Sequence, residues 1–341
     1  MAAIDLGTNN CRLLIAAPAR AGFRVVDAYS RIIRLGEGVS RTGVLAPAAM
    51  TRAFEALSVC AERMRRRGVM GVRAVATEAC RTAGNGASFI AEVERRTGIR
   101  LEVIAPRREA ELAVAGCLDL IDARARAVLV LDVGGGSTEL SWLDLHDPFF
   151  GLPLETAVRR RPPLHAWLSV PIGVVSLAEA YPESREDVGA WFGAMVDHVK
   201  GLISPFTGAD RLRGAFGAGR AHLIGASGAI TSLAGVGLGL PRYRRERVDG
   251  LWLTRADCEA TAARIAGLDP GERAQLPCIG PERADLVLAG AAILQAVQEL
   301  WPCERVRVAD RGLREGLILG LLAERRRTRW PGPVPAGARA R

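Results

Sequence analysis

Ile4-Asp5-Leu6-Gly7-Thr8-Asn9-Asn10 is the first of two stretches that decide the fold of this 341-residue chain. The second is Leu131-Asp132-Val133-Gly134-Gly135-Gly136-Ser137-Thr138-Glu139. Each has an Asp at the end of an apolar strand, then a glycine turn with a hydroxyl residue, then another strand. Glycine lets backbone N–H groups approach phosphate oxygens closely, and a neighbouring carboxylate suits a divalent metal. Because the pattern occurs twice, we predict two related half-domains that close on one cleft.

Composition is consistent with two domains of ordinary size. Apolar residues make up 49% of the chain, so it can build a large core. No apolar run approaches the roughly 18 residues that a membrane helix needs. The chain opens on a strand-like segment and lacks the basic and apolar regions of a signal peptide. We therefore expect a cytoplasmic protein without a membrane partner.

The charge is strongly basic and comes almost entirely from arginine. The formal net charge is +9, and Lys200 is the only lysine. Two explanations stay open: a general compositional bias toward arginine, or a field that attracts polyanions. Aromatic residues are only 5% of the chain, so no stacking platform for nucleic acid is indicated, and we expect no specific nucleic-acid partner.

The seven cysteines form no CxxC pair, and their number is odd. This pattern argues against a zinc site or a disulfide framework. We expect the cysteines to be small buried apolar residues.

The expected elements alternate between strands and helices, as in an α/β domain. In the first part, strands are expected at 2–6, 12–17, 23–35, 72–76 and 101–104, and helices at 47–67, 86–97 and 106–120. In the second part, strands are expected at 128–132, 139–143, 168–171, 222–225 and 305–309, and helices at 174–180, 185–204, 229–236, 255–266, 283–300 and 312–325.

These elements give a domain division. We predict a first domain over residues 1–122, completed by the C-terminal helix 312–325, and a second over 123–311. Residues 146–163 are expected to form an irregular surface insertion, and residues 326–341 a disordered tail, because both are rich in Pro and Arg.

A third glycine stretch, Gly225-Ala226-Ser227-Gly228, runs from a strand into a helix. Ser227, Gly228 and the first N–H groups of that helix are placed to face an anion. A strand, not a helix, follows the Gly134–Gly136 turn, which argues against a dinucleotide-binding fingerprint. No Gly-Lys-Ser/Thr sequence supports a P-loop, and Ala229 breaks the Gly-x-Ser-x-Gly motif of serine hydrolases.

Taken in order, these motifs resemble the exopolyphosphatase / guanosine pentaphosphate phosphohydrolase family. Supporting stretches are Ala76-Thr77-Glu78-Ala79-Cys80-Arg81, the segment 104–112, Arg283-Ala284-Asp285 and Gly312-Leu313-Arg314-Glu315-Gly316. The resemblance spans residues 2 to about 320. It implies an actin-like fold, with two ribonuclease-H-like halves around a cleft, in the family's short form. That form implies a homodimer.

The resemblance also implies roles for individual residues. Glu109 matches the glutamate that activates the attacking water, and Asp132 and Glu139 complete the catalytic carboxylates. Asp5, Asp132 and Glu139 would hold Mg²⁺, with Mn²⁺ as the alternative. Phosphates would be held by a larger set: Gly7, Thr8, Asn9, Arg81, Gly134, Gly135, Gly136, Ser137, Ser227 and Gly228.

One segment departs from the family pattern. Pro106 replaces a glycine and Arg108 replaces the first of two glutamates, so Arg108 is expected either to lower the pKa of Glu109 or to bind substrate.

Four activities follow as hypotheses. The first is hydrolysis of the terminal phosphate of inorganic polyphosphate, and the second is hydrolysis of guanosine pentaphosphate. The third is a nucleotide- or polyphosphate-binding sensor without turnover. A sugar or acetate kinase is the fourth, and Glu109 argues against it.

Overall fold

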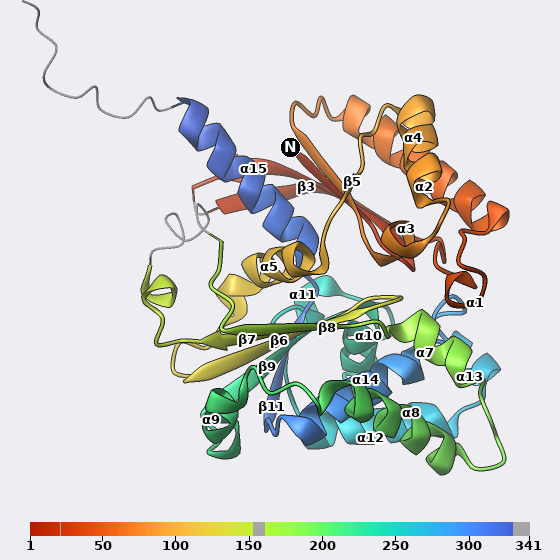
Figure 1. Cartoon of the computed structure of the whole chain (residues 1–341), viewed down its shortest axis with the longest axis vertical. Helices are drawn as coiled ribbons and strands as arrows, with labels where there is room; N and C mark the ends of the chain where they lie inside the picture. Colours follow the sequence, from red (N-terminus) through yellow and green to blue (C-terminus); the bar gives the residue numbers. More distant parts are fainter. Residues whose placement is uncertain (21, 153–160, 330–341) are drawn as a thin grey trace, which may run out of the picture.

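The structure is a computed structural model, and it describes residues 1–20, 22–152 and 161–329. Two mixed sheets, each covered by helices, form two halves of the molecule (Figure 1). The elements of the first half are β1 (Ala2–Leu6), β2 (Asn10–Ala19), β3 (Gly22–Ile32), α1 (Val39–Thr42), α2 (Pro47–Arg66), β4 (Val72–Ala76), α3 (Glu78–Thr82), α4 (Gly86–Thr97) and β5 (Glu102–Val103).

Helix α5 (Pro106–Cys117) and the 3₁₀ turn Leu118–Leu120 lead into the second half. Its strands are β6 (Ala127–Val133), β7 (Thr138–Asp144), β8 (Ala166–Val170), β9 (Ala221–Ala226), β10 (Trp252–Thr254) and β11 (Arg305–Ala309). Its helices are α7 (Val174–Ala180), α8 (Val188–Ile203), α9 (Arg213–Gly217), α10 (Gly228–Gly237), α11 (Arg245–Val248), α12 (Arg255–Gly267), α13 (Pro270–Gln275) and α14 (Val287–Leu300), with 3₁₀ turns at Pro148–Gly151 and Asp210–Leu212. The chain returns to the first half in α15 (Leu313–Arg329).

The two sheets repeat one topology. The first has the order β3-β2-β1-β4-β5, with β1–β2 and β2–β3 antiparallel and β1–β4 and β4–β5 parallel. The second has the order β8-β7-β6-β9-β11, with the same directions, and adds β10 at the edge. The internal duplication predicted from the glycine stretches is therefore confirmed. Strand β10 was not expected, because a three-residue edge strand is too short to show alternation.

The core is divided among the faces of the two sheets. Ile4, Leu13 and Leu57 represent the cluster between the first sheet and α2 and α4. Most of the helices of the second half cover one face of the second sheet, where Trp142 and Trp301 are fully buried. All seven cysteines are buried and free, as expected.

Helices α5 and α15 occupy the space between the two sheets (Figure 1). Leu112 of α5 packs with α15 on the first sheet, whereas Val114 and Cys117 pack on the second. The two helices touch backbone to backbone: a Cβ on Gly116 would lie 1.9 Å from the Gly312 carbonyl oxygen. We call this contact the hinge, because it joins the halves at the two points where the chain passes between them.

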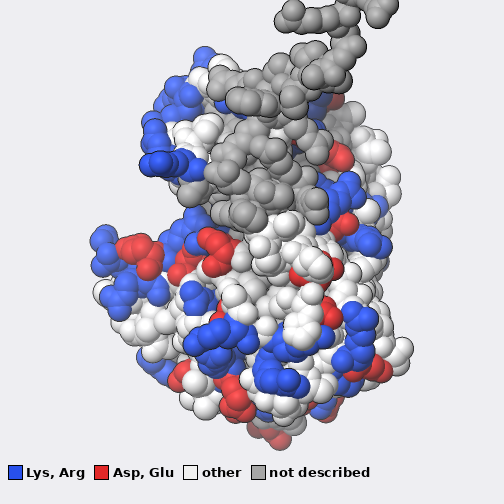
Figure 2. Space-filling view, turned by 90° about the vertical axis from the view of Figure 1, so that its left-hand side faces the viewer, with Lys and Arg blue, Asp and Glu red and all other residues white. Residues whose placement is uncertain are grey.

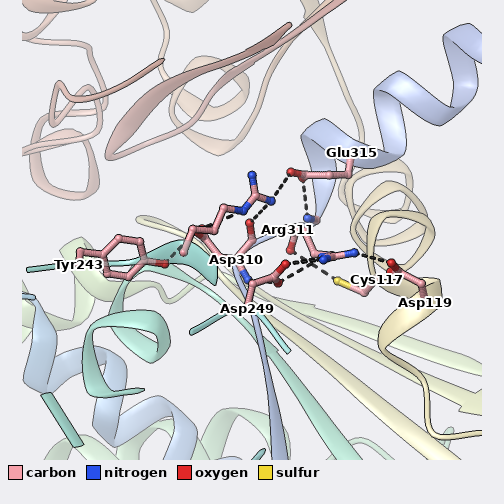
Figure 3. A network of polar contacts seen from close by, with 9 residues as sticks. Cys117, Asp119, Tyr243, Asp249, Asp310, Arg311 and Glu315 are labelled. Carbon is pink, nitrogen blue, oxygen red and sulfur yellow. Dashed lines mark hydrogen bonds and ion pairs between the residues drawn. The ribbon is translucent and has the colours of Figure 1, made fainter. Parts of the chain in front are cut away.

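A polar network surrounds the hinge (Figure 3). Arg311 binds both Asp249 and Asp119, and the Cys117 thiol donates to the Arg311 carbonyl. Arg245 bonds to Glu315 at 3.0 Å. These contacts tie α5, α15 and the end of β11 together.

Some boundaries differ from the sequence expectation. Helix α14 begins at Val287 instead of 283, because Gly280 has φ = 73° and residues 281–286 form turns. Helix α15 reaches Arg329, so residues 326–329 of the expected tail are helical. Of the insertion expected at 146–163, residues 153–160 lie outside the described residues. Among the described residues, no helix is long and apolar enough to cross a membrane.

Candidate active site

The two glycine turns have the same backbone geometry. The Gly7 N–H donates to the Asn10 carbonyl at 2.9 Å, and the Gly134 N–H donates to the Ser137 carbonyl at 2.9 Å. In both turns, a backbone carbonyl accepts a hydrogen bond from an N–H group later in the chain. The Thr8 carbonyl accepts from the Gly36 N–H, and the Gly135 carbonyl accepts from the Val175 N–H. Within the described residues, the N–H groups of Thr8, Asn9, Gly135 and Gly136 donate no hydrogen bond. Those groups are available to an anion.

The turns touch each other across the boundary between the halves. A Cβ on Gly135 would lie 2.9 Å from the Thr8 Cβ and 3.0 Å from the Asn9 nitrogen. A Cβ on Gly136 would lie 3.2 Å from Glu78 Cγ. Only glycine at these positions lets the backbones approach so closely.

A cavity of ≈ 490 Å³ lies between the halves and gathers most of the predicted site. The predicted residues on its wall are Asp5, Gly7, Thr8, Asn9, Glu109, Asp132, Gly134, Gly135, Ser137, Ser227 and Gly228. Gly136, Glu139 and Arg81 are not on that wall. The Ser227 hydroxyl caps α10 by accepting from the Ile230 N–H at 3.0 Å.

Glu109 lies in the first turn of α5, which Pro106 begins at a position where no N–H is needed. Its side chain is buried, and Oε2 has no hydrogen-bond donor among the described residues. Burial raises the pKa of Glu109, and the carboxylates of Glu139, Asp132 and Asp5 raise it further. A buried carboxylate with a free oxygen facing a cavity is suited to accept a proton from water.

Asp132 and Glu139 lie opposite each other on paired strands. Burial raises the pKa of Asp132 to about 8, with further contributions from Glu139 and Asp5. Burial also raises the pKa of Glu139 to about 7, although its Oε1 accepts hydrogen bonds from Ser137 and Ser169. Such crowding of buried acids favours either protonation or a bound cation.

The donor atoms fit a hard cation. Besides the carboxylates, the amide oxygens of Asn9 and Asn10 are buried without a donor among the described residues. In that part of the chain, no three His, Cys, Asp or Glu residues form a ready-made metal cluster. Mg²⁺ does not need one, because it commonly uses one or two carboxylates and keeps waters and phosphate oxygens as its other ligands.

Arg81 lies beside the predicted base and away from the cavity wall. Its guanidinium donates to the Ile104 carbonyl at 2.8 Å, pairs with Glu78, and lies 3.6 Å from Glu109 Oε2. A direct clamp on phosphate stays a prediction, whereas the observed contacts orient Glu109. Neither expectation for Arg108 has support here, because its Nη1 bonds to Glu111 at 3.2 Å.

Three arginines on the cavity wall had no role assigned from the sequence: Arg12, Arg283 and Arg314. None of them has a carboxylate within salt-bridge distance among the described residues. Burial lowers the pKa of Arg283 and of Arg314, and the nearby Arg12 charge lowers both further. A signal existed for Arg12, since the hairpin around Gly7–Asn10 pairs it with Asp5.

Several arginines elsewhere on the surface are paired with carboxylates. Figure 2 shows basic side chains with acidic ones among them on the left-hand side of Figure 1. Arg126 and Arg211 both pair with Asp144, and Arg213 pairs with Asp210. The cavity thus gathers three arginines without a carboxylate partner, and this concentration of positive charge suits an anionic ligand.

Comparisons with known proteins show the family of the chain. A model of the "Ppx/GppA phosphatase family" matches residues 14–325. The chain is 29% identical to exopolyphosphatase 2 of Mycobacterium tuberculosis, over 94% of this chain and 98% of that protein. It is 27% identical to the guanosine-5'-triphosphate,3'-diphosphate pyrophosphatase of Aliivibrio fischeri, over 95% of this chain but only 59% of that protein.

Solved structures show the same architecture. An exopolyphosphatase from Cytophaga hutchinsonii superposes with a TM-score of 0.81 at 22% identity, over 95% of this chain and 97% of that one. The Aquifex aeolicus family member gives 0.72 at 26% identity, over 95% and 97%. The actin-like fold with duplicated ribonuclease-H-like halves is therefore confirmed, and the chain belongs to the Ppx/GppA phosphatase family.

Proposed function

We propose that this protein is an exopolyphosphatase that hydrolyses the terminal phosphate of inorganic polyphosphate with the help of Mg²⁺. The observation that carries the proposal is the buried Oε2 of Glu109, which accepts no hydrogen bond from the described residues, on a cavity that also presents unpaired arginines and free backbone N–H groups. The near-complete coverage of a curated exopolyphosphatase supports polyphosphate as the first substrate to test.

The residues divide the work of phosphoryl transfer. The N–H groups of the two glycine turns hold the terminal phosphates, and Arg12, Arg283 and Arg314 neutralise the chain behind them. Glu109 accepts a proton from the water that attacks the terminal phosphorus, while Arg81 keeps its carboxylate oriented. Asp132, Asp5 and Glu139 would hold Mg²⁺, which would supply charge neutralisation at the transferred phosphoryl group.

The decisive experiment compares Glu109→Gln with Glu111→Gln. Phosphate release from long-chain polyphosphate is measured with Mg²⁺, and Glu109→Gln is expected to lose at least about a hundredfold in kcat, the scale of a lost general base. Glu111 is buried on the same helix but pairs with Arg107, Arg108 and Arg161, so its variant should keep most of the activity. No release by the wild-type protein, or full activity of Glu109→Gln, would contradict the proposal.

A specific observation also favours guanosine pentaphosphate as a second candidate. The cavity wall beyond the turns includes Tyr243, Pro277, Ile279 and Leu286, and a polyphosphate chain has no apolar part to cover them. With both substrates present at equal concentration, preferential cleavage of the nucleotide would favour this reading. Tight binding of either without hydrolysis would instead indicate a sensor.

A further inference from the structure

A set of polar contacts joins the two halves far from the hinge. Arg34, in the loop after β3, donates through both Nη atoms to Asp285, at 2.8 and 2.9 Å, and to the Glu282 carbonyl at 3.1 Å. Glu179 at the end of α7 accepts from the Gly38 N–H at 2.9 Å and from the Ser40 hydroxyl at 3.0 Å. Figure 1 shows α1 facing α7 on the right-hand side, whereas α5 and α15 lie toward the left. We call these contacts the latch.

The latch is coupled to the first glycine turn. The N–H groups of Ile33 and Arg34 both donate to the Asn9 carbonyl, at 2.8 and 3.0 Å, and the Gly36 N–H donates to Thr8 O. Arg34 has φ = 46°, and it is the one described residue other than glycine with positive φ. Arg52 fixes the segment by donating to the Ile33 carbonyl at 2.7 Å. Moving Arg34 would therefore move the backbone that supports Thr8 and Asn9.

The latch is coupled to the second turn in the same way. The first N–H groups of α7, from Val174 and Val175, donate to the Gly134 and Gly135 carbonyls at 3.0 and 2.8 Å. Glu179 lies on the same helix. Asp285, the partner of Arg34, is two residues from the cavity arginine Arg283. Each half of the latch is thus connected to a part of the site by a short, continuous stretch of backbone.

The latch and the hinge differ in strength. At the hinge, backbones of α5 and α15 are in contact, and Arg311 is held by two carboxylates. At the latch, the side chains of Arg34 and Asp285 are 31% and 50% exposed, so water and salt compete for them. The halves will consequently separate at the latch before they separate at the hinge.

We propose that Arg34, Asp285 and Glu179 are positioning residues that hold the two glycine turns together for catalysis and release them for exchange of substrate and product. This inference rests on the proposed function only for its catalytic readout. Closure of the latch brings Gly135 against Asn9 and completes the set of N–H donors around the terminal phosphate. Opening it parts the turns while the hinge stays intact.

The test combines a distance measurement with kinetics. Because all seven native cysteines are buried, spin labels can be attached to Arg41→Cys and Glu186→Cys, two exposed positions of which the first lies in the first half and the second lies between α7 and α8 in the second half. The ligand-free protein should give a short distance, and Arg34→Glu should lengthen and broaden the distribution. The charge-swapped pair Arg34→Glu/Asp285→Arg should restore it.

Activity on polyphosphate should follow the distances. Arg34→Glu is expected to lower kcat by about tenfold through loss of the closed population, and the swapped pair should recover most of it. The matched control is Arg31→Glu, which breaks the similarly exposed ion pair Arg31–Glu55 within the first half, 2.8 Å long, and should change neither readout. Unchanged distances in Arg34→Glu, or no rescue by the swap, would overturn the latch. If the wild-type protein hydrolyses no substrate, the proposed function fails, while the distances still decide whether the latch exists.

Discussion

The two glycine turns have the same backbone geometry, but the side chains beside them differ in charge. Both are four-residue turns closed by the same hydrogen bond, and both follow a strand that carries an Asp one residue before its last residue. The residue paired with that Asp differs: Arg12 stands opposite Asp5, and Glu139 stands opposite Asp132. Residues paired across antiparallel strands lie about 4.5–5.5 Å apart at Cβ, close enough to set each other's electrostatics.

The residue opposite each Asp sets the charge beside its turn. At the first turn Asp5 stands opposite the positively charged Arg12, and Arg283 and Arg314 add positive charge to the same cavity. The second turn combines two acids, with their pKa values raised to about 8 and about 7. We infer that the side chains of the first hairpin (β1–β2) favour phosphate through Arg12, whereas the paired acids of the second hairpin (β6–β7) supply most of the negative charge for a cation that Asp5 would also contact. The two hairpins thus share a backbone scaffold, and the different residue at one paired position makes their charges complementary.

Glu139→Gln is expected to have the largest effect on the charge difference between the two turns. The amide keeps the shape and can still accept from Ser137 and Ser169, but it removes one of the two charges of the second hairpin. We expect the Mg²⁺ concentration for half-maximal activity to rise by about a hundredfold, the upper range for groups that support a metal. A Mg²⁺ titration of phosphate release measures this.

Ser169→Ala is the control for that variant. It removes one hydrogen bond to Glu139 without changing the charge, so its effect should be much smaller. An unchanged Mg²⁺ requirement in Glu139→Gln would show that the second hairpin is not the cation side.

Arg12→Gln tests the opposite side. Loss of one charge-assisted contact to phosphate, worth about 1.5–3 kcal/mol, should raise KM for polyphosphate by about tenfold or more. The Mg²⁺ requirement and kcat should change little, because the second hairpin is intact. Arg24→Gln, an exposed change on the neighbouring β3, serves as the control. A higher Mg²⁺ requirement in Arg12→Gln with no change in KM would reverse the assignment of the two sides.

Gly135→Ala and Gly7→Ala compare the turns sterically. A Cβ on Gly135 meets Thr8 at 2.9 Å, whereas a Cβ on Gly7 lies 3.4 Å or more from its nearest neighbours. Overpacking of this kind costs about 1–3 kcal/mol, so we expect Gly135→Ala to lose several-fold in kcat/KM and Gly7→Ala to stay near wild type. Equal kinetics of the two variants would mean that the close approach of the turns does not matter for turnover.

The duplication and the two glycine turns of the cavity wall could be predicted from the sequence, because each turn carries its signal within ten residues. Strands β1, β4 and β11 and helices α4 and α7 have the predicted bounds. Those elements combine clear periodicity with strong end signals such as Gly98 after α4.

The remaining site residues depend on pairing that local pattern does not reveal. Arg283 reaches the cavity through a turn where a helix was expected, whereas Arg12 is the exception, because its pairing with Asp5 follows from the local hairpin. The latch contact between Arg34 and Asp285 joins residues 251 positions apart. In a chain with so many arginines, composition cannot tell an unpaired cavity arginine from a paired surface one.

The smallest expected effect is a pH dependence of stability that separates the two Asp residues. Unfolded Asp132 loses its proton near its ordinary pKa of about 4, whereas the folded side chain loses it near about 8. Between these values the folded protein binds more protons than the unfolded chain, so the free energy of unfolding falls as pH rises. Without Mg²⁺, Tm should therefore drop by several degrees between pH 5 and 8, on a scale of about 2–4 °C per kcal/mol.

Asp132→Asn should flatten that drop more than Asp5→Asn. Burial raises the pKa of Asp5 as well, but the Arg12 and Arg314 charges offset part of the rise, whereas Glu139 and Asp5 add to the rise at Asp132. Added Mg²⁺ should raise Tm more at pH 8 than at pH 5, because a cation needs the deprotonated carboxylates. Melting curves of the wild-type protein and both variants, with and without Mg²⁺, test this. If Asp5→Asn flattened the curve as much as Asp132→Asn, the residues opposite the two Asp side chains would not control their protonation, and the electrostatic difference between the hairpins would have to come from elsewhere in the cavity.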